Sequence, residues 1–557
     1  MRRRRSASRR ALLAVVGSCA VLVLLSLAFG PRGALFGPRE RVLVIGAGAA
    51  GLAAAAALSG YASVLILEGQ ERVGGRMHTN RSLGVPVELS AAWIHRADGN
   101  LVMDLAREFG CATYPSENKR LVVYGDSGAQ VGAATVTRVY QSLSRTIMPE
   151  VLRRRSGLRA DGRDDVSLGT LMSRLGSVES LGVGVKRCVL DFLLFRDVVQ
   201  DHTADLWQTS AARYDTDHYG GRGKDVVLPS GYDCIALGLQ RRSGLSVHSP
   251  ARFDETRSEG DAKRGQPDMR TGIRLAEAGE VTRLRWSEAG VEATLADGTI
   301  EQADRAIVTV PLGVLKASIA PAGVGGGREA LVFDPPLPQR MVSAIERLGN
   351  GEALKVALRF PFVFWPAEAH FLGKIGGGCD GMGSGRHMEF LNVAKFTNGA
   401  PVLLMETEST HARTLAAMSD AQVVRYVLDE LGRMFGAAAV PAPTGHIVAR
   451  LGSNRFQRGG FSFLQTGSTH ALHAALAEPL AGGRLLLAGE HASSLHAGTV
   501  HGAIVSGRRA AASVRAAMRG ADAVAAGEAF ETEYREKLFA LIYNRDEEEE
   551  EEWDRNP

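Results

Sequence analysis

Two short apolar runs enclose a glycine-rich turn near the start of the chain. Residues 41–45 and 63–67 are rich in valine, leucine and isoleucine, which is typical of strands buried in a parallel sheet. Between them lie the Gly-Ala-Gly-Ala-Ala-Gly turn of residues 46–51 and an alanine- and leucine-rich stretch, residues 52–58, that favours a helix. Glu68 directly follows the second run. The pattern predicts a strand, a tight turn, a helix, a second strand and an acidic residue.

This order is typical of a Rossmann-type dinucleotide-binding unit. Glycines allow the tight turn and let the backbone approach a pyrophosphate at the N-terminus of the helix. We therefore expect Gly46, Gly48, Ala50 and Gly51 to form the phosphate site. Glu68, about 20 residues beyond the first glycine, can accept hydrogen bonds from the ribose hydroxyls of the adenosine. The motif by itself does not discriminate NAD from FAD.

Residues 72–77, Arg-Val-Gly-Gly-Arg-Met, continue the nucleotide-binding pattern. They resemble the second dinucleotide-binding signature of the flavin-containing amine oxidases, and the resemblance extends along most of residues 40–520. Residues 87–95 end in Trp-Ile-His, which is similar to the polyamine oxidases. The segment that begins at Tyr214 resembles one shared by polyamine oxidases and the lysine-specific histone demethylase-like branch. The chain thus resembles the amine oxidase family, and within it the polyamine oxidases most.

The resemblance implies that the dinucleotide is FAD. In that family the Gly-Gly-Arg segment runs past the pyrophosphate and the ribityl chain, and a late glutamate binds a ribityl hydroxyl. A helix that opens at residue 499 would direct its positive end at the flavin. Residues 461–464 contain no cysteine, so we expect FAD to bind without a covalent bond. Beyond the first glycine motif, the implied cofactor-binding residues are Gly75, Arg76, Trp93, Val281, Glu490, Thr499 and Val500.

Five residues are candidates for catalysis or substrate binding. Lys355 lies in an apolar strand-like stretch that resembles the strand carrying the family's active-site lysine, and alternation along a strand would direct it to the face opposite its apolar neighbours. His95 is a candidate for catalysis and, with Glu88, for holding a distal ammonium group. Phe461 matches one wall of the family's aromatic cage. Thr499 occupies the position at which many members have the opposing tyrosine.

The resemblance also implies an α/β fold of the amine oxidase or glutathione-reductase-2-like type, in which a Rossmann-type FAD-binding domain is interleaved with a substrate-binding domain of mixed sheet plus helices. We expect a polar surface insertion at residues 252–272 and a C-terminal helix with a disordered acidic tail at residues 521–557. The FAD-binding domain would comprise residues 40–100, 225–315 and 480–520, and the substrate-binding domain residues 101–224 and 316–479.

The N-terminus carries most of the charge excess. The net charge is +4, and because arginines crowd the first ten residues it gives no reason to expect a nucleic acid partner. An uncharged apolar run at residues 11–30 follows them, which is long enough to span a bilayer. Residues 1–39 therefore predict a signal anchor and a membrane-anchored lumenal or extracellular enzyme. A cleaved or twin-arginine signal, giving a secreted protein, is the alternative. The five cysteines form no Cys-x-x-Cys pair, so we expect no zinc site.

The resemblance implies an FAD-dependent oxidase that acts on the C–N bond of a polyamine. Hydride transfer to flavin N5 would give an iminium, which water would hydrolyse to an aldehyde and a shorter amine, and molecular oxygen would reoxidise the flavin and become hydrogen peroxide. A histone demethylase-like enzyme, an L-amino acid oxidase and a catalytically inactive flavoprotein scaffold remain alternatives.

Overall fold

The computed structural model describes residues 39–117, 120–158, 164–214, 223–248, 271–321, 330–377 and 385–543. The chain divides into two compact units, Met1–Glu40 and Arg41–Pro557, and the description below concerns the second. The predicted signal anchor, nearly all of the polar insertion and the acidic run that ends the chain lie outside the described residues.

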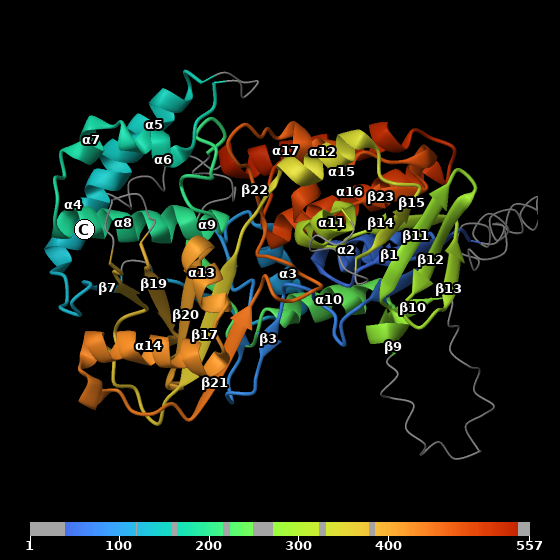
Figure 1. Cartoon of the computed structure of the whole chain (residues 1–557). Coiled ribbons are helices and arrows are strands. Elements are labelled where there is room, and N and C mark those ends of the chain that lie inside the picture. Colours follow the sequence, from blue (N-terminus) through green and yellow to red (C-terminus); the bar gives the residue numbers. More distant parts are fainter. Residues whose placement is uncertain are drawn as a thin grey trace, which may run out of the picture. The chain divides into compact units, whose positions relative to one another are not determined.

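One six-stranded sheet contains the predicted nucleotide-binding strands. Its strand order is β23-β14-β1-β2-β10-β9, and every neighbouring pair is parallel. The strands come from three distant parts of the sequence (Figure 1). Their bounds are β1 (Arg41–Ile45), β2 (Ser63–Glu68), β9 (Val247–His248), β10 (Gly272–Leu275), β14 (Arg305–Val308) and β23 (Leu485–Leu487).

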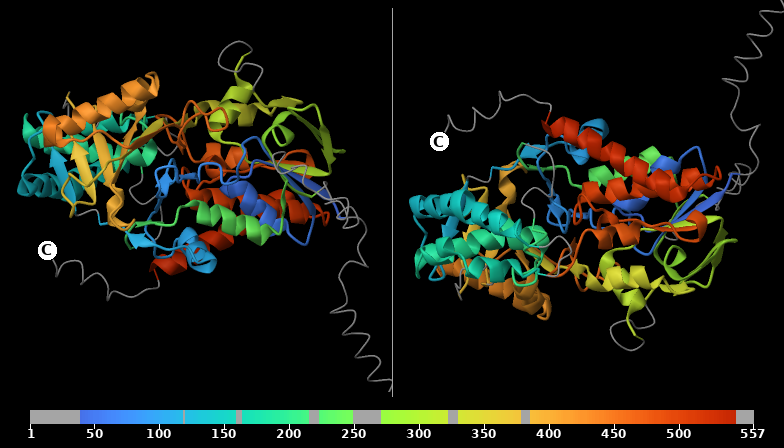
Figure 2. Two further views of the ribbon diagram at one scale, coloured as in Figure 1. Left: turned by 90° about the horizontal axis from the view of Figure 1, so that it is seen from below. Right: turned by 90° about the horizontal axis from the view of Figure 1, so that it is seen from above.

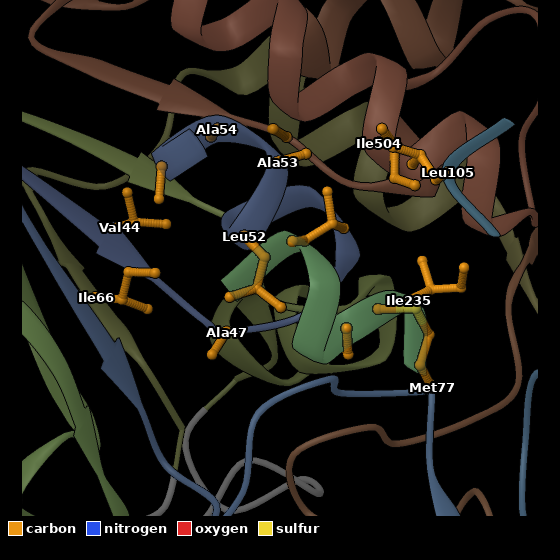
Figure 3. Close-up of a cluster of buried hydrophobic side chains, with 14 of the residues drawn as sticks. Val44, Ala47, Leu52, Ala53, Ala54, Ile66, Met77, Leu105, Ile235 and Ile504 are labelled. Carbon is orange, nitrogen blue, oxygen red and sulfur yellow. The ribbon is translucent and has the colours of Figure 1, made fainter. Parts of the chain in front are cut away.

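Helices cover one face of this sheet. Helix α2 (Ala49–Leu58) packs against α16 (Val500–Ala517) and α10 (Asp233–Ser243). Figure 3 shows Val44 and Ile66 of the strands facing a cluster formed by the side chains of these helices, among them Leu52 of α2. A four-stranded sheet and two further helices pack on the other face, and their elements are β11 (Val281–Ser287), β12 (Gly290–Leu295), β13 (Ile300–Ala303), β15 (Val332–Asp334), α11 (Leu312–Ile319) and α12 (Gln339–Arg347). Because both faces are covered, the interiors of the central strands β1, β2 and β14 are apolar and buried.

A second six-stranded sheet has the order β21-β17-β20-β19-β18-β7. Its pairs are antiparallel, except that β18 and β7 run parallel. Helices α4 to α8, in teal, gather with these strands at one side of the molecule, away from the first sheet (Figure 2). The strands are β7 (Leu121–Tyr124), β17 (Ala353–Arg359), β18 (Phe371–Lys374), β19 (Met388–Asn392), β20 (Val402–Glu408) and β21 (Gly445–Arg450).

Strand β17 separates its side chains between the two faces of this sheet. Leu354, Val356 and Leu358 pack in a cluster with helix α14 (Asp420–Phe435). Successive side chains of a strand point to opposite faces. Lys355 therefore lies on the face away from α14, which is the geometry that the sequence pattern predicts.

The helices that complete this half of the molecule lie before β17 in the sequence. They are α4 (Ala133–Ser142), α5 (Met148–Arg155), α6 (Leu168–Ser173), α7 (Gly176–Glu179), α8 (Val185–Leu194) and the π-helical turns at residues 143–147 and 195–199. Their apolar side chains form one buried cluster. Arg196, in the second of these π-helical turns, donates a hydrogen bond to Glu389 of the second sheet.

The predicted membrane-anchored or secreted location is corrected. Among the residues that the structure describes, no helix is long and apolar enough to cross a membrane. A span needs about 20 predominantly apolar residues, and the two described helices of 18 residues or more, α16 and α17 (Ala523–Tyr543), both contain charged residues. The prediction rested on residues 11–30, which lie outside the described part of the chain.

The structure contains a disulfide between two of the cysteines whose pairing could not be predicted from the sequence. Cys111, which follows helix α3 (Leu101–Phe109), is bonded to Cys234 in the first turn of α10. The bridge joins segments 123 residues apart in the sequence. It fastens two helices that flank the nucleotide-binding sheet.

Candidate active site

A cavity of about 1610 Å³ lies between the two six-stranded sheets. It exceeds the roughly 300–1,000 Å³ of a typical small-ligand pocket. The glycine-rich turn, β17, β20 and the start of α16 all line it. The volume can therefore hold a dinucleotide together with a substrate.

The glycine turn at one end of the cavity depends on missing side chains. Gly46 has a φ of +109°, which favours glycine, and a Cβ on Gly51 would lie 2.0 Å from the carbonyl oxygen of Gly46. Gly46, Gly48 and Ala50 line the cavity, whereas Gly51 does not. Gly75 also lines it, and its missing Cβ leaves the Gly48 backbone room to pass. Gly51 thus lets α2 approach the turn, and the other positions leave backbone open to a ligand.

Glu68 is buried beside this turn. Its carboxylate accepts hydrogen bonds from the backbone N–H groups of Ala47, at 2.8 Å, and Gln70, at 2.9 Å. Burial raises the pKa of Glu68, and these hydrogen bonds offset part of the shift. Glu68 and Val281 both line the cavity, at the end where the resemblance implies adenosine.

Arg76 and Glu490 form an ion pair, with Nη1 3.0 Å from Oε1. Burial would raise the pKa of Glu490, but the Arg76 charge and a hydrogen bond from Ser462 outweigh it and lower the pKa to about 2. The backbone N–H of Gly498 also donates to this carboxylate, at 2.9 Å. Both side chains line the cavity. Glu490 therefore stays charged and balances much of the Arg76 charge.

Thr499 is the N-cap of helix α16. Its hydroxyl accepts from the Gly502 N–H at 2.9 Å and donates to the His496 carbonyl at 2.8 Å. Thr499 and Val500 both line the cavity. Because capping occupies the hydroxyl, the threonine presents the positive end of the helix rather than a substrate hydrogen bond.

Lys355 projects from β17 toward the cavity. Its Nζ donates to Glu406 Oε1 at 2.6 Å and lies 5.4 Å from the centre of the Trp93 ring. The Lys355 and Glu406 side chains are only 7% and 10% exposed, respectively. Trp93 and Phe461 also line the cavity. The structure thus brings the predicted lysine and both predicted aromatic residues to one space.

Three glutamates on neighbouring strands line the cavity beside Lys355, and we call them the acidic wall: Glu389, Glu406 and Glu408. Glu406 of β20 lies opposite both Lys355 of β17 and Glu389 of β19 in the strand register. Arg196 donates to Glu389 through Nε. Glu408 also lines the cavity, and burial raises its pKa well above the ordinary value. The sequence analysis missed these four residues, although Glu389, Glu406 and Glu408 interrupt strongly apolar strands, which is the signal that could have identified them.

His95 and Glu88 have different surroundings. His95 lines the cavity with Nδ1 3.2 Å from Asp225 Oδ2, and this contact raises its pKa although burial would lower it. Glu88 is not among the lining residues. It accepts hydrogen bonds from Thr79 Oγ1 and the Tyr232 N–H, both at 2.9 Å. We correct its assignment from substrate binding to joining β4 (Val87–Glu88) to the start of α10.

The sequence is similar to plant polyamine oxidases. Polyamine oxidase 4 of Oryza sativa subsp. japonica is 31% identical over 484 residues, which cover 84% of this chain and 87% of the relative. Lysine-specific histone demethylase 1 homolog 2 of the same organism is 29% identical over 85% of this chain, but the match spans only 56% of that relative.

Two solved structures share the fold. A putrescine oxidase with redesigned cofactor binding superposes with a TM-score of 0.62, covering 86% of this chain and 99% of its own. Cyclohexylamine oxidase from Brevibacterium oxydans gives a TM-score of 0.60, with 86% and 100% covered. Both are 18% identical to this chain, so they show the fold alone.

The family described as flavin containing amine oxidoreductase matches residues 49–515. The match spans most of both six-stranded sheets and nearly all of the cavity wall. The predicted α/β fold class, the FAD cofactor and the amine oxidase activity are confirmed, and the chain belongs to the flavin containing amine oxidoreductase family.

Proposed function

We propose that the protein oxidises the C–N bond of a polyamine and yields an aldehyde, a shorter amine and hydrogen peroxide. The observation that carries this proposal is the composition of the cavity. A glycine-lined cradle opens into a space walled by Glu389, Glu406 and Glu408 beside Lys355. An acidic wall of this kind suits a substrate with several positive charges.

The residues at and around the glycine turn are suited to binding FAD. The backbone is exposed at Gly48 and Gly75, Glu68 retains acceptor capacity for ribose hydroxyls, and the Arg76–Glu490 pair lies beyond the turn. Bound FAD supplies the hydride acceptor at flavin N5 and is reoxidised by molecular oxygen. The absence of cysteine from residues 461–464 supports non-covalent binding.

Lys355 is the residue that we assign to proton handling. An ammonium group carries three donors, and the bond to Glu406 uses one of them. The ion pair fixes Nζ near the Trp93 ring, from which it can also donate to a group in the cavity. Phe461 and Trp93 supply apolar surface that would orient the substrate chain and exclude water near the reacting carbon.

The acidic wall would act on substrate binding, before the oxidation step. Clefts lined by one sign of charge attract ligands of the opposite sign. Two carboxylates of the wall are paired with cations of the protein, Glu406 with Lys355 and Glu389 with Arg196. Because these two pairs are nearly neutral, the attraction for a cationic substrate would come from Glu408, which forms no ion pair in the described part of the chain.

A peroxide assay on the full chain loaded with FAD tests the proposal. Spermine, spermidine, their N-acetyl forms, a dimethyl-lysine peptide and L-amino acids would be compared, and the aldehyde product identifies the carbon attacked. We expect peroxide from a polyamine, with a large loss in Lys355→Met. Lys316→Met is the matched control, because Lys316 bonds the carbonyl of Ile345 and does not line the cavity.

The substrate panel also discriminates the alternatives. Turnover of the methylated peptide or of an amino acid, without turnover of any polyamine, would assign the protein to the demethylase-like or amino acid oxidase branch. A yellow protein that oxidises none of these compounds would instead support an inactive flavoprotein scaffold.

A further inference from the structure

Three loops meet at the end of β2, beside Glu68. A Cβ on Gly69 would lie 2.3 Å from the Phe456 ring, and a Cβ on Gly279 would lie 2.6 Å from the Glu68 carbonyl oxygen. Gly69, Gly279 and Phe456 all line the cavity. Such close approaches leave no room for side chains, so the loops that follow β2, β10 and β21 are packed together and form one rim of the cavity.

Arg455 and Glu280 bond two of these loops to each other. Nη1 of Arg455 donates to Glu280 Oε1 at 2.8 Å, and Nη2 donates to Oε2 at 2.6 Å. The guanidinium carbon lies 4.4 Å from the centre of the Phe456 ring. A planar guanidinium that is bonded at two nitrogens and stacked on a ring is held in one orientation. We call Arg455, Phe456 and Glu280 the clasp.

The clasp lies at the edge of the cavity. Arg455 and Glu280 both line the cavity, and their side chains are 41% and 12% exposed. The exposed fraction of Arg455 is far above the 7% of Lys355, which lines the same cavity at depth. The neighbouring residues on this rim are Glu68 and Val281, at the end of the cavity where the resemblance implies adenosine.

The backbone on each side of the ion pair is fixed. The Asn454 side chain accepts from the Phe456 N–H at 2.9 Å, and the Arg458 N–H donates to the Asn454 carbonyl at 2.8 Å. The Glu280 N–H donates to the Ala276 carbonyl, also at 2.8 Å. Ordering the side chains of the clasp therefore costs little additional conformational entropy, which favours a persistent ion pair.

We propose that the clasp retains FAD by holding this rim of the cavity closed. Arg455 follows β21 of the second sheet, whereas Glu280 precedes β11, in the sheet that packs on the nucleotide-binding strands. The ion pair thus joins the two halves of the molecule that enclose the cavity, across 175 residues of sequence. Its bonds are made within the protein, so opening the rim must break them whether FAD enters or leaves. The clasp therefore slows both steps and changes the affinity little, and it acts whichever amine is oxidised.

The rate of FAD exchange tests the clasp in the loaded enzyme. The full chain carrying radiolabelled FAD is mixed with excess unlabelled FAD, and the loss of label gives the dissociation rate. From the usual strengths of an exposed ion pair and a cation–π contact, Arg455→Ala should release FAD about 3- to 30-fold faster than the wild type. The dissociation constant, measured from the flavin still bound at equilibrium after dilution, should stay within about twofold. Because salt screens exposed charges, it should reduce the difference in rate between the two proteins.

Variants of the partner and of a remote ion pair separate the clasp from a general loss of charge. Glu280→Gln should also speed release, and the double variant Arg455→Ala/Glu280→Gln should be no faster than Arg455→Ala, because both changes remove the same bonds. Arg340→Ala is the matched control, since Arg340 forms a bidentate pair with Glu478 and neither residue lines the cavity. This control should leave FAD release unchanged.

Three results would overturn the inference. Release of FAD from Arg455→Ala at the wild-type rate would show that the rim does not control dissociation. Faster release with an equal rise in the dissociation constant would show that Arg455 contacts FAD directly instead of holding the rim closed. A double variant whose effect is the product of the two single effects would show that Arg455 and Glu280 act independently.

Discussion

Replacing Lys355 by methionine would leave the Glu406 carboxylate buried without its cation. The two side chains are 7% and 10% exposed, and Nζ lies 2.6 Å from Oε1. Removing one partner of a buried ion pair costs about 3–5 kcal/mol, because the remaining charge is desolvated and uncompensated. Methionine fills a similar volume, so packing contributes little to this loss.

The magnitude can be expressed as a melting temperature. The entropy of unfolding is about 2.1 cal/mol/K per residue, which gives about 1.2 kcal/mol/K for a chain of 557 residues. A loss of about 3–5 kcal/mol then lowers Tm by about 3–4 °C. Differential scanning calorimetry of Lys355→Met and the wild type, both loaded with FAD, measures this shift.

The double variant Lys355→Met/Glu406→Met tests the cause of the loss. Apolar residues of similar volume often replace a buried ion pair at no cost in stability. We expect the double variant to recover most of the Tm while peroxide production stays low, because the donor at Nζ is still missing. A Lys355→Met protein as stable as the wild type would refute the reasoning. So would a double variant less stable than the single one.

Three further predictions follow from the site. Gly51→Ala should destabilise the apoprotein by about 3 kcal/mol or more in thermal unfolding, because its Cβ would lie 2.0 Å from the Gly46 carbonyl oxygen. Gly48→Ala is the matched control: its Cβ meets no protein atom within 4 Å, so it should leave the stability of the apoprotein unchanged and weaken FAD binding. Burial raises the pKa of Glu88 from 4.5 to about 7, so the folded state binds more protons than the unfolded state and stability falls as pH rises from about 4.5 to about 7. In Glu88→Gln, Tm should therefore change little over this pH range, and KM should stay within about twofold of the wild-type value. A large rise in KM would instead indicate that Glu88 binds substrate. Thr499→Ala should cost about 1 kcal/mol in thermal unfolding through the lost N-cap, while Thr499→Ser should cost little; equal losses would contradict the capping role.

Local patterns in the sequence were enough for the elements whose causes are local. Continuous apolar runs placed β1 and β2 within a residue of their observed ends. The spacing of glycines placed the turn between them, because only glycine tolerates the φ of +109° at Gly46 and the close approach at Gly51. Lys355 was assigned to the inner face because a strand alternates its side chains with a period of two.

The acidic wall was decided only by the tertiary structure. Glu406 lies 51 residues after Lys355, and Glu389 lies 193 residues after Arg196. Which strands become neighbours depends on sheet register and on the packing of whole layers, and no local pattern contains that information. For the same reason the sequence could not show that Glu88 bonds the start of α10 or that the Thr499 hydroxyl is used by its own helix. The sequence determined which residues are able to do chemistry here, and the tertiary structure decided which of them meet, because meeting depends on contacts between distant segments.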